Sequence, residues 1–270
     1  MRPPPPLDAQ MALFLDVDGT LLEIAPRPQD VSVPSGLPAL LGELARQRNG
    51  AVALVSGRPL DEIDRLFQPW RGAAAGLHGI VRRRADGAVD RVANPAAAVA
   101  LDRLRPRLAT LKGAETGLIL EDHIWALALH YRAVPERECE IRALAKAWVQ
   151  REPALRLIAG KMVVEFQPTG SDKGAAIAAF LAEPPFAGRS PVFIGDDVTD
   201  EDGFAEVSGR GGIAIRVGPP KPSRAAYGLA TVEAVRRWLA AAGRKGEATA
   251  SLERQLPADV SPGENKGELG

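Results

Sequence analysis

Apolar residues in this chain gather in short runs that alternate with segments carrying one apolar face at helical spacing. The first run, 12–15, is followed by a helical pattern over 34–49 and a second run at 51–55. A short helix over 60–67 and a third run at 73–77 continue the order. Runs of four or five apolar residues are typical of strands buried on both faces, and their alternation with helices predicts a parallel sheet.

The same alternation returns toward the carboxyl end of the chain. It predicts a helix over 173–182, a strand over 191–194, a helix over 200–207 and a strand over 213–217. An amphipathic helix over 230–241 closes the pattern. Together the two parts predict the fold class α/β, with a Rossmann-like, doubly wound parallel-sheet core.

The middle of the chain follows a different pattern. A hairpin at 80–92 precedes two units, each of which combines an amphipathic helix with a hairpin. This arrangement predicts an inserted α+β domain. The expected organisation is a disordered Pro-rich N-terminus over 1–10, a core made of 11–82 and 167–242, the insert over 83–166, and a disordered polar tail over 243–270.

Composition narrows the function classes. Lys+Arg and Asp+Glu both number 34, so no net charge attracts nucleic acid or an anionic membrane. No apolar run reaches the ~18 residues of a membrane span, and Cys139 is the single cysteine, which excludes an intrachain disulfide. We expect a cytoplasmic monomer whose partner is a small molecule, with no nucleic acid and no membrane.

Acidic side chains directly follow the first predicted strand. Asp16 and Asp18 are two positions apart, so they leave the strand on the same side, at the carboxyl edge where open α/β sheets bind ligands. Paired carboxylates raise each other's pKa unless a cation lies between them. The pattern therefore indicates a metal site with a nucleophile. The alternative is an ordinary strand-to-helix turn, because Asp, Gly and Thr are common turn residues.

Two further segments carry groups that suit a phosphate. Ser56 and the N–H groups beside Gly57 follow the second strand, where a simple tight turn is the alternative. Lys173 lies in the first turn of a predicted helix, where a cation opposes the helix dipole. Binding of a phosphate beside Asp16 would explain a lysine at this position. The alternative is a solvated surface lysine.

A third segment, 196–202, places five carboxylates after a buried strand. Asp200 can cap the next helix, and the two acidic residues after it suit the first turn of that helix. The start of this helix does not account for Asp196 and Asp197. Their position predicts ligation of a hard cation by oxygen.

In chain order these segments contain Asp-x-Asp-Gly-Thr, then Ser, then Lys, then Gly-Asp-Asp-x-x-Asp. This order resembles the haloacid dehalogenase-like phosphatase superfamily, and the insert is similar to its C2-type cap. Residues 11–240 more closely resemble trehalose-6-phosphate phosphatases, in the segments 13–21, 55–58, 76–79, 128–132, 164–168, 171–174 and 195–201. The resemblance implies a Mg²⁺-dependent enzyme that hydrolyses trehalose 6-phosphate through an aspartyl-phosphate, the last step of trehalose biosynthesis.

The resemblance also implies roles for single residues. Asp16 is the expected nucleophile and Asp18 the general acid and base, while Ser56 and Lys173 complete the catalytic set by holding phosphate oxygens. The implied Mg²⁺ ligands are Asp16, Asp18 through its backbone carbonyl, Asp196, Asp197 and Asp200. The implied substrate-binding residues are Gly19, Thr20, Gly57, Arg58, His78, Glu121, His123, Arg132 and Glu165.

The inserted cap is expected to choose the sugar. Glu121 and Glu165 are implied acceptors for trehalose hydroxyls, and Lys161 and Arg132 are weaker candidates; a solvated strand end is the alternative for each charge. His123 replaces a lysine that relatives of the bacterial type often carry, which changes the charge near phosphate at pH 7. His130 is read as a packing residue, because Leu129 and Tyr131 flank it.

Three other functions remain open at this level. The first is a capped phosphatase for another sugar phosphate, such as sucrose phosphate or mannosyl-phosphoglycerate. The second is a non-catalytic phosphosugar-binding module, against which the intact acidic and lysine positions argue. The third is a mutase, which would return phosphate to the sugar instead of to water.

Overall fold

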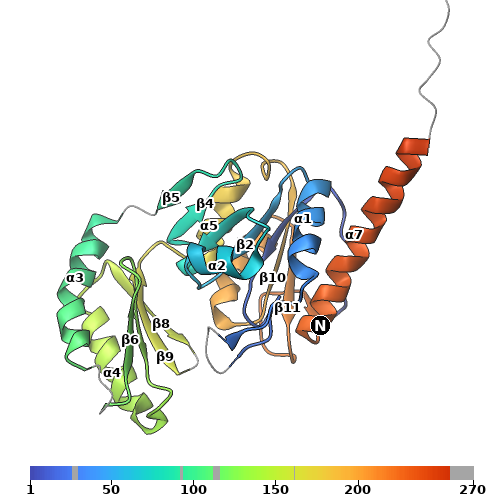
Figure 1. The fold of residues 1–270 in the computed structure, drawn as a ribbon. Helices are drawn as coiled ribbons and strands as arrows, with labels where there is room; N and C mark the ends of the chain where they lie inside the picture. Colours follow the sequence, from blue (N-terminus) through green and yellow to red (C-terminus); the bar gives the residue numbers. More distant parts are fainter. Residues whose placement is uncertain (26–29, 92–93, 112–115, 161, 256–270) are drawn as a thin grey trace, which may run out of the picture.

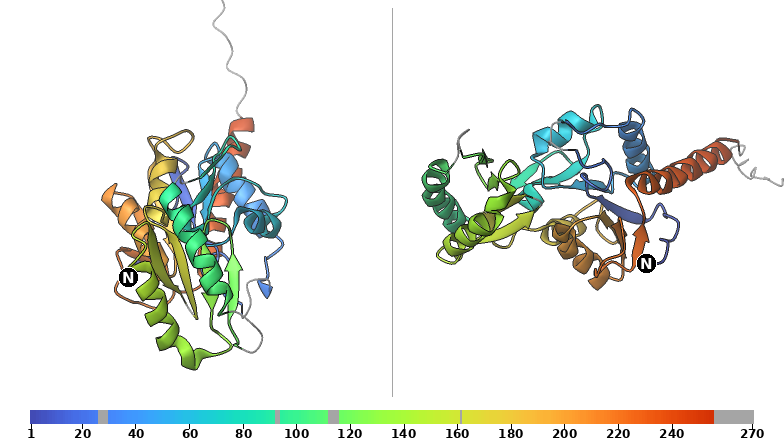
Figure 2. Two further views of the ribbon diagram at one scale, coloured as in Figure 1. Left: turned by 90° about the vertical axis from the view of Figure 1, so that its left-hand side faces the viewer. Right: turned by 90° about the horizontal axis from the view of Figure 1, so that it is seen from below.

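The structure is a computed structural model that describes residues 1–25, 30–91, 94–111, 116–160 and 162–255. Within these residues the chain forms an eight-stranded sheet and a separate four-stranded sheet. Figure 1 shows the smaller sheet and its helices as a lobe beside the larger one, and the right-hand view of Figure 2 shows the same separation from below. None of the helices in the described residues is long and apolar enough to cross a membrane.

The large sheet has the order β12-β11-β10-β1-β2-β3-β4-β5. Pairing is parallel from β12 to β3 and antiparallel for β4 and β5. Since the chain proceeds outward in both directions from the β1–β10 pair, this pair is the switch point, where open sheets bind ligands. The strands are β1 (Met11–Leu15), β2 (Val52–Val55), β3 (Ala73–Gly76), β4 (Val81–Arg83), β5 (Val89–Arg91), β10 (Ser190–Gly195), β11 (Ile213–Val217) and β12 (Tyr227–Leu229).

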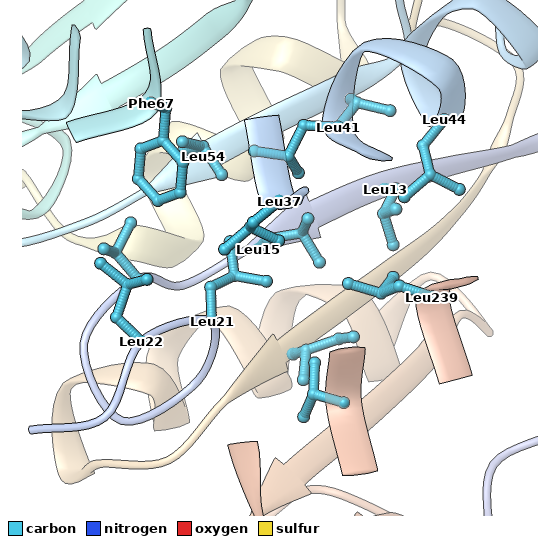
Figure 3. Close-up of a cluster of buried hydrophobic side chains, with 14 of the residues drawn as sticks. Leu13, Leu15, Leu21, Leu22, Leu37, Leu41, Leu44, Leu54, Phe67 and Leu239 are labelled. Carbon is cyan, nitrogen blue, oxygen red and sulfur yellow. The ribbon is translucent and has the colours of Figure 1, made fainter. Parts of the chain in front are cut away.

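Helices cover both faces of this sheet. Alternate residues of β1 point to opposite faces. Leu13 and Leu15 therefore pack in the cluster drawn in Figure 3, and Phe14 packs in the cluster on the other face. These three layers confirm the predicted doubly wound α/β core. The first face carries α1 (Leu37–Gln47), α2 (Leu60–Phe67) and α7 (Val232–Gln255), and the second carries α5 (Lys173–Leu181) and α6 (Glu201–Gly209).

The small sheet is antiparallel, with the order β6-β7-β9-β8. Leu127 and Leu129 of β7 are buried against the helices of the lobe, so Ala128 and His130 point to the opposite face. This opposite face carries Glu121 and Glu165, which both lie opposite Ala128. The elements are α3 (Pro95–Ala109), β6 (Ile119–Asp122), β7 (Leu127–His130), α4 (Glu138–Val149), β8 (Leu155–Gly160) and β9 (Val163–Pro168).

Short 3₁₀ turns are also present among the described residues. They are η2 (Leu77–Gly79), η3 (Pro135–Arg137) and η4 (Val198–Asp200). The predicted hairpin at 80–92 is present as β4 and β5, but it pairs with β3 and extends the large sheet. The four-stranded unit therefore starts later than the predicted boundary at residue 83.

Two terminal segments also differ from expectation. Residues 1–10 were expected to be disordered, yet Arg2 bridges to Tyr227 and Trp238 Nε1 donates to the Pro5 carbonyl at 3.2 Å. Helix α7 continues to Gln255, where a disordered tail was expected from residue 243. The expected tail residues 256–270 lie outside the described residues. Strand β12, which was not predicted, pairs with β11 at the edge of the sheet.

Candidate active site

A cleft of about 290 Å³ lies between the large sheet and the four-stranded lobe, which we call the cap. Its floor is formed by residues that follow the carboxyl ends of core strands, as expected for the switch point of an open sheet. Its roof comes from the cap. The predicted site residues that line the cleft are Asp16, Asp18, Ser56, Gly57, Arg58, His78, Glu121, His123, Arg132, Glu165, Lys173, Asp196, Asp197 and Asp200.

Lys173 joins two carboxylates on the floor of the cleft. Its Nζ donates to Asp16 Oδ1 at 2.7 Å and to Asp200 Oδ1 at 2.6 Å, and all three side chains are at most 6% exposed. Burial alone would lower the pKa of Lys173, but the two carboxylates raise it above its ordinary value. The lysine is therefore a fixed cation beside Asp16, and the surface-lysine alternative is wrong.

Negative charge nevertheless exceeds positive charge on this floor. Burial raises the pKa of Asp16 well above its ordinary value, and the neighbouring Asp200 and Asp196 act in the same direction, while Lys173 opposes them. Burial and the nearby Asp200 and Asp197 carboxylates raise the pKa of Asp196 to about 7. Clustered carboxylates with raised pKa values are typical of a site that takes up a further cation.

The carboxylates of Asp16, Asp196 and Asp200 can each place an oxygen within 4.8 Å of the others. Oxygen donors at this spacing fit a hard divalent cation. Asp200 is otherwise occupied, because its Oδ2 accepts from the backbone N–H groups of Asp196 and Asp197 at 2.8 and 2.9 Å. Asp16 and Asp196 therefore retain the greater capacity for a cation.

Gly19 permits this close arrangement. Its φ is +81°, a left-handed conformation that favours glycine, and a Cβ there would lie 2.3 Å from Asp196 Oδ2. Gly19 thus gives the Asp196 carboxylate its space beside the loop after β1. In the described part of the chain, neither Gly19 nor Thr20 lines the cleft, and the buried Thr20 Oγ1 has no hydrogen-bond partner.

Asp18 is held by an arginine from the next strand loop. Arg58 is 7% exposed and donates from Nε and Nη2 to the two carboxylate oxygens of Asp18, each at 2.7 Å. The Nη1 of Arg58 donates to Glu62 at 3.0 Å. Sequence reasoning expected Arg58 to bind substrate and did not identify Glu62, whose i,i+4 spacing from Arg58 was the available signal.

The loop after β2 also orders the base of the cleft. Ser56 is buried, and its Oγ accepts from the backbone N–H of Arg58 at 3.1 Å. His78 has a φ of +54°, which is uncommon for a residue other than glycine. This backbone aims its ring across Gly57, where a Cβ would lie 2.6 Å from Nε2. The same nitrogen lies 3.5 Å from Glu165 of the cap.

The cap presents two glutamates in one row of its sheet. Glu121 of β6 and Glu165 of β9 both lie opposite Ala128 of β7, so they occupy the same face, and both line the cleft. His123 and His130 place Nε2 at 3.3 and 3.2 Å from Glu121 Oε2. The hydrogen bond with His123 and the close approach of His130 hold the pKa of Glu121 well below its ordinary value.

Glu165 has its own polar neighbours. Gln167 Nε2 donates to Glu165 Oε2 at 2.7 Å. Burial would raise the pKa of Glu165, but His78 and Gln167 lower it below its ordinary value. Sequence reasoning missed Gln167, although it is two positions from Glu165 and so shares its face. Arg132 lines the cleft, and Lys161 lies outside the described residues.

A doubly wound sheet, an acidic cluster at its switch point and an inserted cap are the features of the capped haloacid dehalogenase-like fold. Solved structures share this fold. One is the C-terminal domain of Candida albicans trehalose-6-phosphate phosphatase (TM-score 0.77, 20% identity, 89% of this chain and 99% of the other). Another is a Bacteroides thetaiotaomicron phosphatase of the haloalkanoate enzyme superfamily (TM-score 0.57, 19% identity, 87% of this chain and 96% of the other).

Sequence comparison identifies the family. Residues 14–233 match the family model described as trehalose-phosphatase. The chain is 46% identical over 232 residues to a probable trehalose-phosphate phosphatase of Sinorhizobium fredii, covering 85% of this chain and 86% of the relative. It is 44% identical over 235 residues to the trehalose-6-phosphate phosphatase of Escherichia coli, covering 87% of each. The chain belongs to the trehalose-phosphatase family.

Proposed function

We propose that this chain hydrolyses trehalose 6-phosphate to trehalose and inorganic phosphate, the last step of trehalose biosynthesis. The observation that carries the proposal is the buried Lys173 bridge between Asp16 and Asp200, which lies across one cleft from the cap glutamates. The names of the Sinorhizobium and Escherichia relatives support the same substrate. A cytoplasmic monomer remains our expectation for its setting.

Asp16 is the proposed nucleophile. Lys173 occupies its Oδ1, so Oδ2 is the oxygen that attacks phosphorus. As the new Asp16–phosphorus bond forms, the bond between phosphorus and the sugar oxygen breaks, and Asp18 gives that oxygen a proton. Asp18 then takes a proton from water, which attacks the phosphoaspartate and releases phosphate. Ser56 and Lys173 hold the phosphate oxygens during both steps.

The acidic floor fits Mg²⁺. The proposed ligands are the carboxylates of Asp16 and Asp196 and the main-chain carbonyl of Asp18, with Asp197 nearby and Asp200 orienting the loop through its backbone hydrogen bonds. When bound, Mg²⁺ supplies positive charge that offsets the charge of the carboxylates and of the transferring phosphoryl group. Lys173 supplies a further fixed positive charge.

The cap glutamates are the proposed sugar-binding groups. Ionised carboxylates accept hydrogen bonds and therefore suit sugar hydroxyls. Their pKa values lie below the ordinary value, which keeps both Glu121 and Glu165 ionised at neutral pH. His123 and Arg132 also line this part of the cleft and complete the proposed substrate-binding surface.

The test is phosphate release with Mg²⁺ from trehalose 6-phosphate, sucrose 6-phosphate, glucose 6-phosphate and mannosyl-phosphoglycerate. We expect selective release from trehalose 6-phosphate, which EDTA stops and added Mg²⁺ restores. Asp16→Asn is the control, because it keeps the size of the side chain and removes the nucleophile. Release from another member of the panel, or equal release by Asp16→Asn, would overturn the substrate or the nucleophile, respectively.

A further inference from the structure

All three histidines of this chain lie beside the two cap glutamates. His123 and His130 approach Glu121, and His78 approaches Glu165, with Nε2-to-oxygen distances of 3.2 to 3.5 Å. The three residues come from a strand of the cap, a turn of the cap and a turn of the core. Packing alone does not require this convergence, in which each imidazole places a nitrogen within 3.5 Å of a carboxylate oxygen.

These contacts use only one oxygen of each glutamate. In the described part of the chain, the polar side-chain contacts of Glu121 and Glu165 all fall on Oε2. A carboxylate has acceptor capacity on both oxygens. Oε1 of each glutamate is therefore the atom that can accept from a sugar hydroxyl, and the contacts to Oε2 fix where that atom lies.

His130 differs from the other two histidines in its place. It does not line the cleft, whereas His78 and His123 do. It lies on β7 opposite Ile119, one position along the same face from Glu121. Its Nε2 is buried and lies 3.2 Å from Glu121 Oε2, as an ion-pair contact outside hydrogen-bond geometry. The residue is thus placed to act on Glu121 and not on a ligand in the cleft.

We propose that His130 is a positioning residue for sugar recognition, which holds Oε2 of Glu121 so that Oε1 is aimed at a hydroxyl of the substrate. This inference rests on the proposed function. A pre-oriented acceptor costs less entropy on binding than a mobile one, so loss of the histidine weakens binding of the sugar without altering the chemistry at Asp16. This proposed role differs from the packing role that the sequence led us to expect.

The experiment compares His130→Ala and His130→Gln with the wild type, using trehalose 6-phosphate and Mg²⁺. Removing one polar contact that orients a charged group predicts a rise in KM of about tenfold, with kcat within about twofold. The amide of glutamine can replace Nε2, so His130→Gln should recover most of the wild-type KM. Ile119→Ala is the matched control, since Ile119 lies opposite His130 on the same face and is 62% exposed.

A double-mutant cycle with Glu121→Ala separates positioning from a structural role. If His130 acts through Glu121, the double variant should have the same KM as Glu121→Ala alone, because the group being positioned is already absent. Inhibition by inorganic phosphate, which binds the core, should be unchanged in His130→Ala. Thermal unfolding of each variant, including His130→Gln, confirms that the cap is folded.

Additive increases in KM, or a parallel loss of phosphate inhibition, would overturn the positioning role. An unchanged KM in a folded His130→Ala variant would do the same. The proposed function fails independently: wild-type protein that releases no phosphate from trehalose 6-phosphate contradicts the substrate, whatever the His130 variants do.

Discussion

Arg58 donates to both carboxylate oxygens of Asp18, from Nε and from Nη2, each at 2.7 Å. The two residues are 40 positions apart and come from the loops after β1 and β2. A planar guanidinium that meets a carboxylate with two parallel hydrogen bonds fixes its orientation as well as its position. The group proposed as general acid and base is therefore aligned by a buried side chain that Glu62 holds in turn.

Replacing Arg58 tests the alignment of Asp18. Arg58→Lys keeps the positive charge but cannot make two parallel hydrogen bonds. Charge-assisted hydrogen bonds contribute about 1.5–3 kcal/mol, so kcat for trehalose 6-phosphate should fall between about tenfold and a hundredfold with a small change in KM. Steady-state kinetics measure both constants. Arg65→Lys, at an exposed position of the same α2 helix, is the control and should leave both unchanged.

The opposite effect on kcat and KM would contradict this role for Arg58. If Arg58→Lys raises KM and leaves kcat intact, the arginine acts on the substrate itself, as the sequence resemblance implied. A second variant tests Glu62, which holds Arg58. Glu62→Gln should produce a smaller loss of kcat in the same direction.

Lys173→Met removes the cation between two buried carboxylates. Asp16 and Asp200 are then left without their shared partner, and breaking a buried ion pair from one side costs about 3–5 kcal/mol. We expect a loss of that order in the free energy of unfolding, measured in urea at neutral pH, together with loss of phosphatase activity. Lys221→Met, at an exposed position, should leave both unchanged. Wild-type stability in Lys173→Met would show that the two carboxylates are not held by this lysine.

Gly19→Ala tests the space that the Asp196 carboxylate occupies. The substitution adds a Cβ 2.3 Å from Asp196 Oδ2 at a φ of +81°. The left-handed conformation alone costs about 1–2 kcal/mol for a non-glycine residue, and displacement of Asp196 should also raise the Mg²⁺ concentration needed for half-maximal activity several-fold.

Gly87→Ala is the matched control for Gly19→Ala. Gly87 has a φ of +89°, but a Cβ there meets no atom within 4 Å. It should lose a similar amount of stability to backbone strain and show an unchanged Mg²⁺ requirement. Equal Mg²⁺ requirements in both variants would contradict the contact between Gly19 and Asp196 as the reason for the glycine.

The core was predictable because its signals are local. Short apolar runs such as 51–55, which alternate with helical patterns, predict buried strands of a parallel sheet. The polar residues that follow the carboxyl ends of such strands gather at one edge of the sheet. Hairpin β4–β5 was recognised as a hairpin, but which sheet it joins depends on pairing with β3. The start of the cap could not be placed from sequence for this reason.

Other side-chain pairs of the site were not predictable, because they depend on contacts between residues distant in sequence. The Arg58–Asp18 pair requires two strand loops to be neighbours. The contact of His130 with Glu121 requires the register of β6 and β7, and a shift by one residue would turn His130 to the helical face. Packing of the Pro-rich N-terminal segment on Trp238 is likewise decided by the tertiary fold and not by its composition.

His123 gives the cap a pH-dependent contribution to stability. Its hydrogen bond to Glu121 raises the pKa of His123 above the ordinary value of 6.5, with burial opposing and the charges of Glu165 and Glu62 adding to the rise. A pKa raised by folding means that the stabilisation is complete below the unfolded pKa and is lost as pH rises through the folded pKa. His123→Gln should therefore lower the free energy of unfolding by about 0.5–1 kcal/mol near pH 5.5, and by much less near pH 8.5.

His123→Lys separates charge from shape in this experiment. Lysine keeps its charge at both pH values, so the stability of this variant should change less than that of the wild type between about pH 5.5 and 8.5. Urea unfolding of the three proteins at both pH values provides the measurement. If His123→Gln costs the same free energy at both pH values, the stabilisation comes from packing and the ion pair with Glu121 contributes nothing. If its cost grows as pH rises, the sign of the linkage is reversed and the pKa of His123 is lowered in the folded protein.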